Sequence, residues 1–135
     1  MDVGDKRIGV AMSDSLGTFA SCLEVINWSN WKTVKARLQE IINEYQITLI
    51  VVGLPKNMDG TLGLQARKVI SFASMLEEET KIGVVLWDER LSSKSAETYL
   101  IQDGVSRKDR KQAIDMISAC IILQNYIDRI QRDGV

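Results

Sequence analysis

The sequence contains no histidine, and this absence removes several kinds of catalytic site. Serine and cysteine nucleophiles of the common hydrolase triads depend on an imidazole base, and catalytic zinc is usually held by imidazole nitrogens. Neither arrangement can be built from this chain. Any chemistry must therefore use carboxylates, lysine, arginine, hydroxyl groups or a metal ion held by oxygen atoms.

Cysteine and long apolar runs are also scarce. The two cysteines, Cys22 and Cys120, are far apart in the sequence and belong to no CxxC pair. We interpret them as small buried apolar residues in a reducing compartment. No apolar run approaches the roughly 18–20 residues of a membrane-spanning helix, and there is no signal-peptide pattern. These absences favour a cytoplasmic protein without membrane attachment.

A charge excess of one sign is missing as well. The net charge is −1, so any basic surface for nucleic acid must be local. Hydrophobic residues make up 45% and charged residues 26% of the 135 residues, as in an ordinary globular protein. This length fits a single domain with its own core, so we predict one domain over residues 1–135.

Apolar residues alternate in the opening stretch, which predicts a β-hairpin over residues 1–14. A third short strand is expected at 22–26. Continuous apolar runs at 49–54 and 82–87 are typical of strands covered on both faces of a sheet. Gly4, in the hairpin turn, can adopt positive φ and would leave backbone amides open to an anion.

Helical periodicity separates and follows these strands. It predicts helices over 31–45, between 66 and 76, up to about 102, and from 106 to about 131. Strands that alternate with helices are joined by crossovers, which make neighbouring strands parallel. The sequence therefore predicts an α/β fold with a mixed five-stranded sheet and helices on both faces.

Acidic residues occupy positions that solubility alone does not explain. Asp2 ends the first strand, and Asp88 and Glu89 follow the last apolar run, at the edge where open α/β sheets bind ligands. Asp115 shares a helical face with apolar residues such as Ala119, where a lone carboxylate is costly unless it is paired or bound to a cation. Divalent cations such as Mg²⁺ prefer oxygen ligands and assist phosphodiester cleavage. The residues therefore permit a metal-assisted reaction.

Asp115 also has a structural interpretation. A salt bridge from Asp115 to Arg90 or Lys111 would tie the helix to the sheet without any metal.

Basic residues lie close to these acids. The run RKDRK begins at Arg107, shortly before Asp115, and is interpreted as a contact for phosphates, with a solvated helix face as the alternative. A polar, glycine-containing loop begins at Lys56 and would either grip substrate or serve as an ordinary connection. The candidate substrate-binding residues are Lys6, Arg7, Lys56, Asn57, Arg90, Arg107, Lys108, Arg110 and Lys111.

Four motifs together resemble the YqgF/RuvX family. They are DVGDKRIGVAMSD (2–14), VVGLPKNMDGT (51–61), WDERLSS (87–93) and AIDMISACIILQNYI (113–127), and they span essentially the whole chain in order. The resemblance implies an RNase H-like fold related to RuvC-type Holliday-junction resolvases. It also implies a metal-dependent nuclease, and the role assigned to the family is maturation of the 5′ end of ribosomal RNA, the pre-16S species.

The resemblance carries site residues and partners with it. The three family acids, which are both catalytic and metal-binding, fall on Asp2, Glu89 and Asp115, with Asp88 as a neighbour. The implied cofactor is Mg²⁺ or Mn²⁺. The implied partner is a structured RNA such as an rRNA precursor, or branched DNA, bound by a monomer or weak homodimer.

The beginning of the chain departs from the family pattern. Family members carry several apolar residues before the first acid, whereas Met1 directly precedes Asp2 here. We expect a start about five or six residues upstream to complete the first strand, since strands average about that length.

Other functions fit part of the sequence. The opening D-x-G-x-x-x-x-G also resembles the phosphate loop of the sugar kinase, actin and heat-shock ATPase superfamily, although 135 residues supply only one of its two lobes. ATP binding would favour that class. A Holliday-junction resolvase is a further alternative. A non-catalytic RNA-binding or transcription-associated protein would keep the fold and its acids without cleaving in Mn²⁺ or Mg²⁺.

Overall fold

The computed structural model describes residues 1–88 and 107–133. Within the last helix, nothing is described of the side chains at 107–113, 115, 132 and 133. The helix predicted up to about residue 102 therefore lies outside the described residues, and so do the predicted site residues Glu89 and Arg90.

The first three strands form an antiparallel sheet in the order β1-β2-β3. They are β1 (Asp2–Val3), β2 (Arg7–Ser13) and β3 (Ala20–Asn27). Alternation along β2 gives the sheet a buried face, to which Ile8 and Val10 contribute. The predicted hairpin and third strand are confirmed, and the third strand is longer than predicted.

Gly4 lies in the tight turn between β1 and β2. Its N–H donates to the carbonyl oxygen of Arg7 at 2.9 Å, and a Cβ at Gly4 would lie 3.1 Å from that same oxygen. Its φ is not positive. The prediction of an amide left open to an anion is therefore wrong, because the turn itself uses this N–H. Close approach of two backbone segments explains the glycine.

The second sheet contains β4 (Leu49–Leu54) and β5 (Gly83–Asp88), which are parallel and in continuous register. The predicted crossover is confirmed. β4 is buried from Ile50 to Leu54, but β5 is not covered on both faces as predicted, since Leu86 is 38% exposed. β5 is less covered because it lies at the edge of its sheet, where within the described residues it pairs with β4 alone.

The prediction of one five-stranded sheet is wrong for the described part of the chain, which has a three-stranded and a two-stranded sheet. β1 is too short to form a ladder with β4. Met1, directly before β1, is hydrogen-bonded to β4: its amino group donates to the Val51 carbonyl oxygen at 2.6 Å, and its carbonyl oxygen accepts from the Gly53 N–H at 3.0 Å. These two bonds follow the parallel pattern, so β1 runs beside β4 in the same direction.

Two helices cover one face of the sheets, α1 (Trp31–Tyr45) and α2 (Leu64–Thr80), and both were predicted. Asn30 caps α1, because its side-chain oxygen accepts the Thr33 N–H at 2.9 Å. The apolar stripes of both helices pack with the strands in one core, which includes Ile8, Val10, Val34, Leu38, Ile41, Ile50, Val52, Val69, Phe72 and Leu76.

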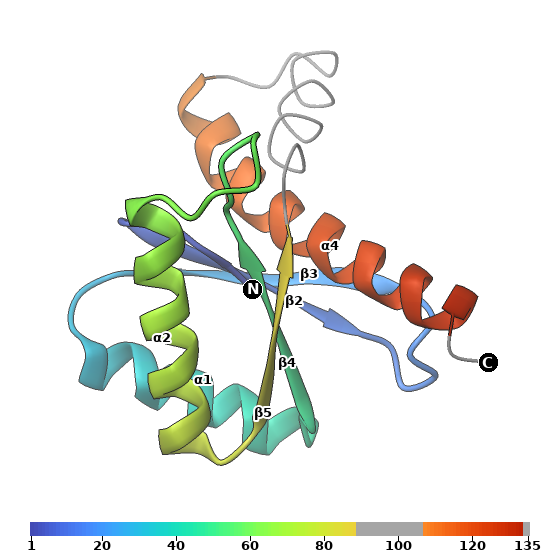
Figure 1. The fold of residues 1–135 in the computed structure, drawn as a ribbon. Coiled ribbons are helices and arrows are strands. Elements are labelled where there is room, and N and C mark those ends of the chain that lie inside the picture. The colour runs from blue at the N-terminus through green and yellow to red at the C-terminus, as the bar shows by residue number, and fades with distance from the viewer. Residues whose placement is uncertain (89–106, 134–135) are drawn as a thin grey trace.

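The last helix, α4 (Arg107–Asp133), covers the opposite face and contacts β2 and β3 (Figure 1). Its buried residues include Ala119 and Ile122, both 0% exposed. Helices therefore lie on both faces, and the α/β fold is confirmed. None of the helices in the described ranges is both long and apolar enough to cross a membrane.

The cysteines differ from the prediction. Cys22 on β3 is exposed, Cys120 on α4 is half-buried, and both are free thiols. Cys22 is exposed because it lies in the strand that forms the outer edge of its sheet.

Candidate functional site

Strand register brings the candidate residues to one end of the sheets. The parallel bonds of Met1 set Asp2 beside Gly53 of β4. Gly53 in turn pairs with Trp87 of β5, so Asp2 and Asp88 lie near the same, carboxyl ends of these strands. Ligands commonly bind at this end of an open α/β sheet.

Asp2 lies between two glycines. It pairs directly with Gly9 on β2 and lies beside Gly53 on β4, and both glycines are buried. Residues directly opposite each other on neighbouring strands share a face. Neither neighbour on the adjacent strands has a side chain that would cover the half-buried Asp2 carboxylate. Sequence analysis did not single out these glycines, because their proximity to Asp2 depends on a register that one strand alone does not reveal.

The face that carries Asp2 is the face covered by α4. The Met1 side chain packs in the core beneath α1 and α2, so the next residue points to the other face. Trp87, in the same row as Asp2, packs edge-on against Tyr126 of α4 with ring centroids 5.5 Å apart.

Side-chain contacts fix the direction of α4. Cys22 of β3 donates to the Met116 carbonyl oxygen at 3.6 Å, and Gln131 donates to the Gly17 carbonyl oxygen at 3.3 Å. The helix therefore runs antiparallel to β3, and its beginning points toward the end of the sheet where β2 starts. In Figure 1, α4 begins at the same end as the loop that leaves β4.

Asp115 and the predicted basic run occupy this first part of α4. Asp115 is one turn before Ala119, on the helix face that Ala119 and Ile122 bury. The backbone thus carries residue 115 toward the sheet. The structure does not describe the side chain of Asp115 or those of the predicted phosphate contacts Arg107, Lys108, Arg110 and Lys111.

The loop after β4 is held by its own hydrogen bonds. The Asn57 side chain donates to the Thr61 hydroxyl at 2.9 Å, and the Asn57 N–H donates to the Thr61 carbonyl oxygen at 2.9 Å. Asp59 accepts from both the N–H and the hydroxyl of Thr61, at 3.0 and 2.6 Å. Gly60 completes the turn with a φ of 87°. Asn57 therefore organises the loop, whatever else it contacts.

Two lysines with described side chains at this end are Lys6 and Lys56. Lys6 is exposed in the β1–β2 turn, and Lys56 is half-buried directly after β4. In the ranges 1–88 and 107–133, neither ammonium group forms a salt bridge. Arg7, half-buried at the start of β2, lies on the same face as Gly9 and Asp2. These cations can meet an anionic ligand next to the Asp2 carboxylate.

A metal site cannot be assembled from the described side chains alone. Among them, no group of three His, Cys, Asp or Glu side chains could hold a metal ion. Of the three predicted ligands, only Asp2 has a described side chain. Its oxygen atoms, at a position flanked by two glycines, are the kind of ligand that a divalent cation prefers.

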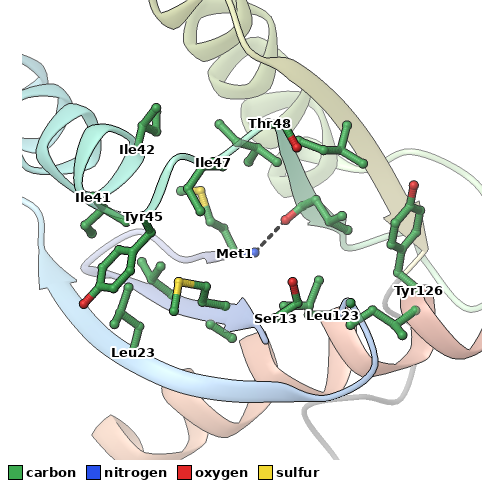
Figure 2. A pocket seen from close by; sticks show the side chains of 18 of the residues that line it. Met1, Ser13, Leu23, Ile41, Ile42, Tyr45, Ile47, Thr48, Leu123 and Tyr126 are labelled. Carbon is green, nitrogen blue, oxygen red and sulfur yellow. Dashed lines mark hydrogen bonds between the residues drawn. The ribbon is translucent and has the colours of Figure 1, made fainter. Parts of the chain in front are cut away.

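A pocket of about 660 Å³ lies at the other end of β1 and β4 (Figure 2). Apolar side chains from every layer line it, among them Met1, Leu23, Ile41, Ile47, Leu123 and Tyr126. The pocket lies between β2 and the start of β4, which continue past Met1 with no strand between them in the described part of the chain. None of the predicted site residues lines it. This hollow is therefore not where the carboxylates and cations gather.

An ion pair away from both ends joins β3 to α1. Arg37 of α1 binds both carboxylate oxygens of Glu24, with Nε at 3.0 Å from Oε2. This hydrogen bonding, aided by the charge of Arg37 and opposed by burial, lowers the pKa of Glu24.

Comparison with known proteins gives one consistent result. The family model "RuvX: Holliday junction resolvase" matches residues 1–129. A protein of Thermoanaerobacter pseudethanolicus is 50% identical over 129 residues, covering 95% of this chain and 93% of its own length. One of Clostridioides difficile is 51% identical over 128 residues, covering 95% and 91%. Both carry the name "Putative pre-16S rRNA nuclease".

Solved structures add the fold. Thermus thermophilus RuvC in complex with a Holliday-junction substrate aligns with a TM-score of 0.56 at 18% identity, over 98% of this chain and 92% of RuvC. A second structure, described as "Thermus thermophilus RuvC structure", aligns with a TM-score of 0.53 at 16% identity, over 98% of this chain and 93% of that RuvC chain. At these identities the likeness establishes the RuvC-like fold. With a family model over nearly its whole length and relatives at half identity, this chain belongs to the RuvX family.

Proposed function

We propose that this protein is a metal-dependent nuclease that hydrolyses phosphodiester bonds in the 5′-end maturation of pre-16S ribosomal RNA. The observation that carries the proposal is the half identity to proteins named as pre-16S rRNA nucleases, over more than nine-tenths of their length. The geometry around Asp2 supports it, since a carboxylate between two glycines at the carboxyl end of parallel strands suits phosphate chemistry. Residues 1–135 would act as one nuclease domain in the cytoplasm, as a monomer or weak homodimer.

Asp2, Glu89 and Asp115 would hold Mg²⁺ or Mn²⁺ and serve as the catalytic acids. When bound, such an ion activates a water molecule and stabilises the leaving oxygen of the cleaved bond. The protein's own residues bind and orient the substrate. Lys6, Arg7 and Lys56 would contact phosphates beside Asp2, together with Arg90 and the basic start of α4. Asn57 would act by keeping the loop after β4 in shape.

The decisive variant is Asp115→Asn. Three carboxylates brought together repel one another, so the metal-free variant should be as stable as the wild type or slightly more stable. Cleavage should be lost, and most of the rise in melting temperature given by Mn²⁺ should disappear, because a ligand stabilises only the state it binds. Melting curves with and without Mn²⁺, together with cleavage rates, measure all three effects.

Asp128→Asn is the matched control on the same helix. Asp128 is exposed and accepts a hydrogen bond from Gln124 at 2.9 Å, so its replacement should leave cleavage and the Mn²⁺ response unchanged. A structural salt bridge at Asp115 predicts the opposite pattern. Asp115→Asn would then strand a cation, cost about 3–5 kcal/mol and leave the Mn²⁺ response intact. That result would reject the proposed metal site.

The substrate has a second candidate, branched DNA. The matching family model is described as a Holliday junction resolvase, and this observation favours testing four-way junctions. Cleavage of a pre-16S rRNA fragment, a four-way DNA junction and linear duplexes should be compared in Mg²⁺ and in Mn²⁺. We expect the RNA to be cut fastest. Preference for the junction would favour the resolvase, and RNA binding without cleavage in either metal would favour a non-catalytic binding protein.

A further inference from the structure

The two cysteines face each other across the interface between β3 and α4. Cys22 is in the middle of that contact on the strand, and Cys120 lies opposite on the helix. Nothing in the proposed nuclease chemistry uses either thiol. Both are free in this structure.

Hydrogen bonds show how close the two thiols lie. Cys22 Sγ donates to the carbonyl oxygen of Met116 at 3.6 Å, and in a helix that oxygen accepts the N–H four residues on, which is that of Cys120. Cys120 Sγ donates to the carbonyl oxygen of Ala20, two residues before Cys22, at 3.4 Å. Each sulfur therefore lies against the backbone that carries the other.

The neighbouring residue Gln124 keeps this interface in place. Its side-chain oxygen accepts the Ala20 N–H at 2.8 Å, and its amide nitrogen donates to the Thr18 carbonyl oxygen at 3.1 Å. The strand and the helix are thus clamped one turn beyond the thiols. Side-chain rotation, with little backbone movement, is what the sulfurs need in order to meet.

The two thiols differ in access and in charge. Cys22 is exposed, whereas Cys120 is half-buried. Burial, with smaller contributions from the nearby charge and hydrogen bonding of Cys22, raises the pKa of Cys120 to about 11. Cys120 is thus protonated at neutral pH, and the exposed sulfur of Cys22 is the one that a small oxidant reaches first.

We propose that Cys22 and Cys120 form an intramolecular disulfide when the protein meets hydrogen peroxide, fastening α4 to β3. The Cys22 thiol loses its proton to solvent and the thiolate attacks one peroxide oxygen. The O–O bond breaks, and the hydroxide that leaves takes up a proton from solvent to become water, so that Cys22 becomes a sulfenic acid. Cys120 then attacks the sulfur of Cys22, the S–S bond forms, and hydroxide leaves and takes the Cys120 proton as water. Both sulfurs are oxidised and one peroxide is reduced to two waters.

The test is peptide mapping of the whole protein after mild peroxide treatment. Trypsin without reductant should release a linked pair, peptides 8–32 and 112–129, that separates on addition of dithiothreitol. The protein should stay monomeric on a non-reducing gel and lose both free thiols. Because the bond closes a loop of about 100 residues, the melting temperature should rise by about 10 °C and return on reduction.

A double variant supplies the matched control. Combining Ser21→Cys with Cys22→Ser keeps two thiols but moves one to the other face of β3, since adjacent residues point to opposite faces. Peroxide should then give no linked peptide and no rise in melting temperature. Wild-type protein that keeps both thiols, forms only disulfides between molecules, or links no more than the double variant would overturn the proposal. The test needs no cleavage assay, so its outcome is independent of the proposed nuclease activity.

Discussion

The two ends of the neighbouring strands β1 and β4 have opposite character. At the carboxyl end, Asp2 lies between Gly9 and Gly53, with Lys6 and Lys56 nearby. At the amino end, apolar side chains surround a pocket of about 660 Å³ next to Met1. One end is polar, and the other is mainly apolar.

The difference teaches that the apolar pocket and the gathered charged side chains belong to different ends of this molecule. The pocket exists because β1 is only two residues long, which leaves β2 and β4 apart beyond Met1. Most of the side chains that line it are apolar, and its polar lining residues are Ser13, Asp14, Ser15, Gln46 and Thr48. The polar end gathers a carboxylate and cations from separate elements.

The largest expected effect separates the two ends by charge. Asp2→Asn should reduce the cleavage rate about 10³-fold, corresponding to about 4 kcal/mol, because it removes a proposed metal ligand. Asp14→Asn is the comparison, since Asp14 lies past the far end of β2 and accepts the Thr18 N–H at 2.7 Å, a bond that asparagine retains. Cleavage rates under saturating Mg²⁺ are the measurement. An equal loss of cleavage rate in both variants would contradict a special role for the carboxyl end.

Next in size is the loss of phosphate contacts. Changing Arg107, Lys108, Arg110 and Lys111 to Gln should weaken nucleic-acid binding about 10²-fold and lower the salt slope by roughly one per lost contact. Lys32→Gln with Lys81→Gln, two exposed positions away from the polar end, should change neither. Binding measured over a series of salt concentrations distinguishes contacts from a solvated helix face. An unaltered slope in the fourfold variant would favour the solvated face.

At the amino end, we expect stability to change when the pocket beside Met1 is filled. Five apolar, strand-forming residues added before Met1 would lie between β2 and β4, pair with both and cover the pocket. We expect the melting temperature to rise by about 5 °C, or roughly 1–2 kcal/mol for a domain of this size. A glycine–serine extension of equal length is the control. If both extensions melt alike, the pocket does not accept a strand.

The smallest effect tests a contact remote from both ends. The lowered pKa of Glu24 means that its pairing with Arg37 stabilises the protein above the ordinary pKa of about 4.5 and is lost as the pH falls through the lowered value. Glu24→Gln should therefore cost about 1 kcal/mol at pH 7 and almost nothing at strongly acidic pH. Urea unfolding at several pH values measures this. Glu40→Gln, at a more exposed partner of Arg37, should cost less, and a pH-independent loss at Glu24 would contradict the pairing.

The helices and strands could be predicted from the sequence, but which strands lie side by side could not. Periodicity identified α1, α2 and the strands, because burial of an apolar face determines which side chains recur. The separation into two sheets was not predictable, since it depends on how few residues of β1 reach β4. For the same reason the glycines beside Asp2 were missed, and β5 was taken as fully covered.

The cysteines illustrate the same limit. Two thiols far apart in sequence gave no sign that they would meet, because their proximity depends on the antiparallel run of α4 along β3. Composition alone favoured burial of both. Asp2, by contrast, was identified from its strand-end position next to a glycine turn.

The amino group of Met1 has a practical consequence for labelling. It is buried and bonded to Val51, so amine-reactive reagents should modify it slowly compared with the exposed lysines. The rate of that modification then reports how often β1 and β4 come apart. A strand-forming affinity tag fused before Met1 would enter the gap between β2 and β4, so that the sequence of the tag would itself change the stability being measured.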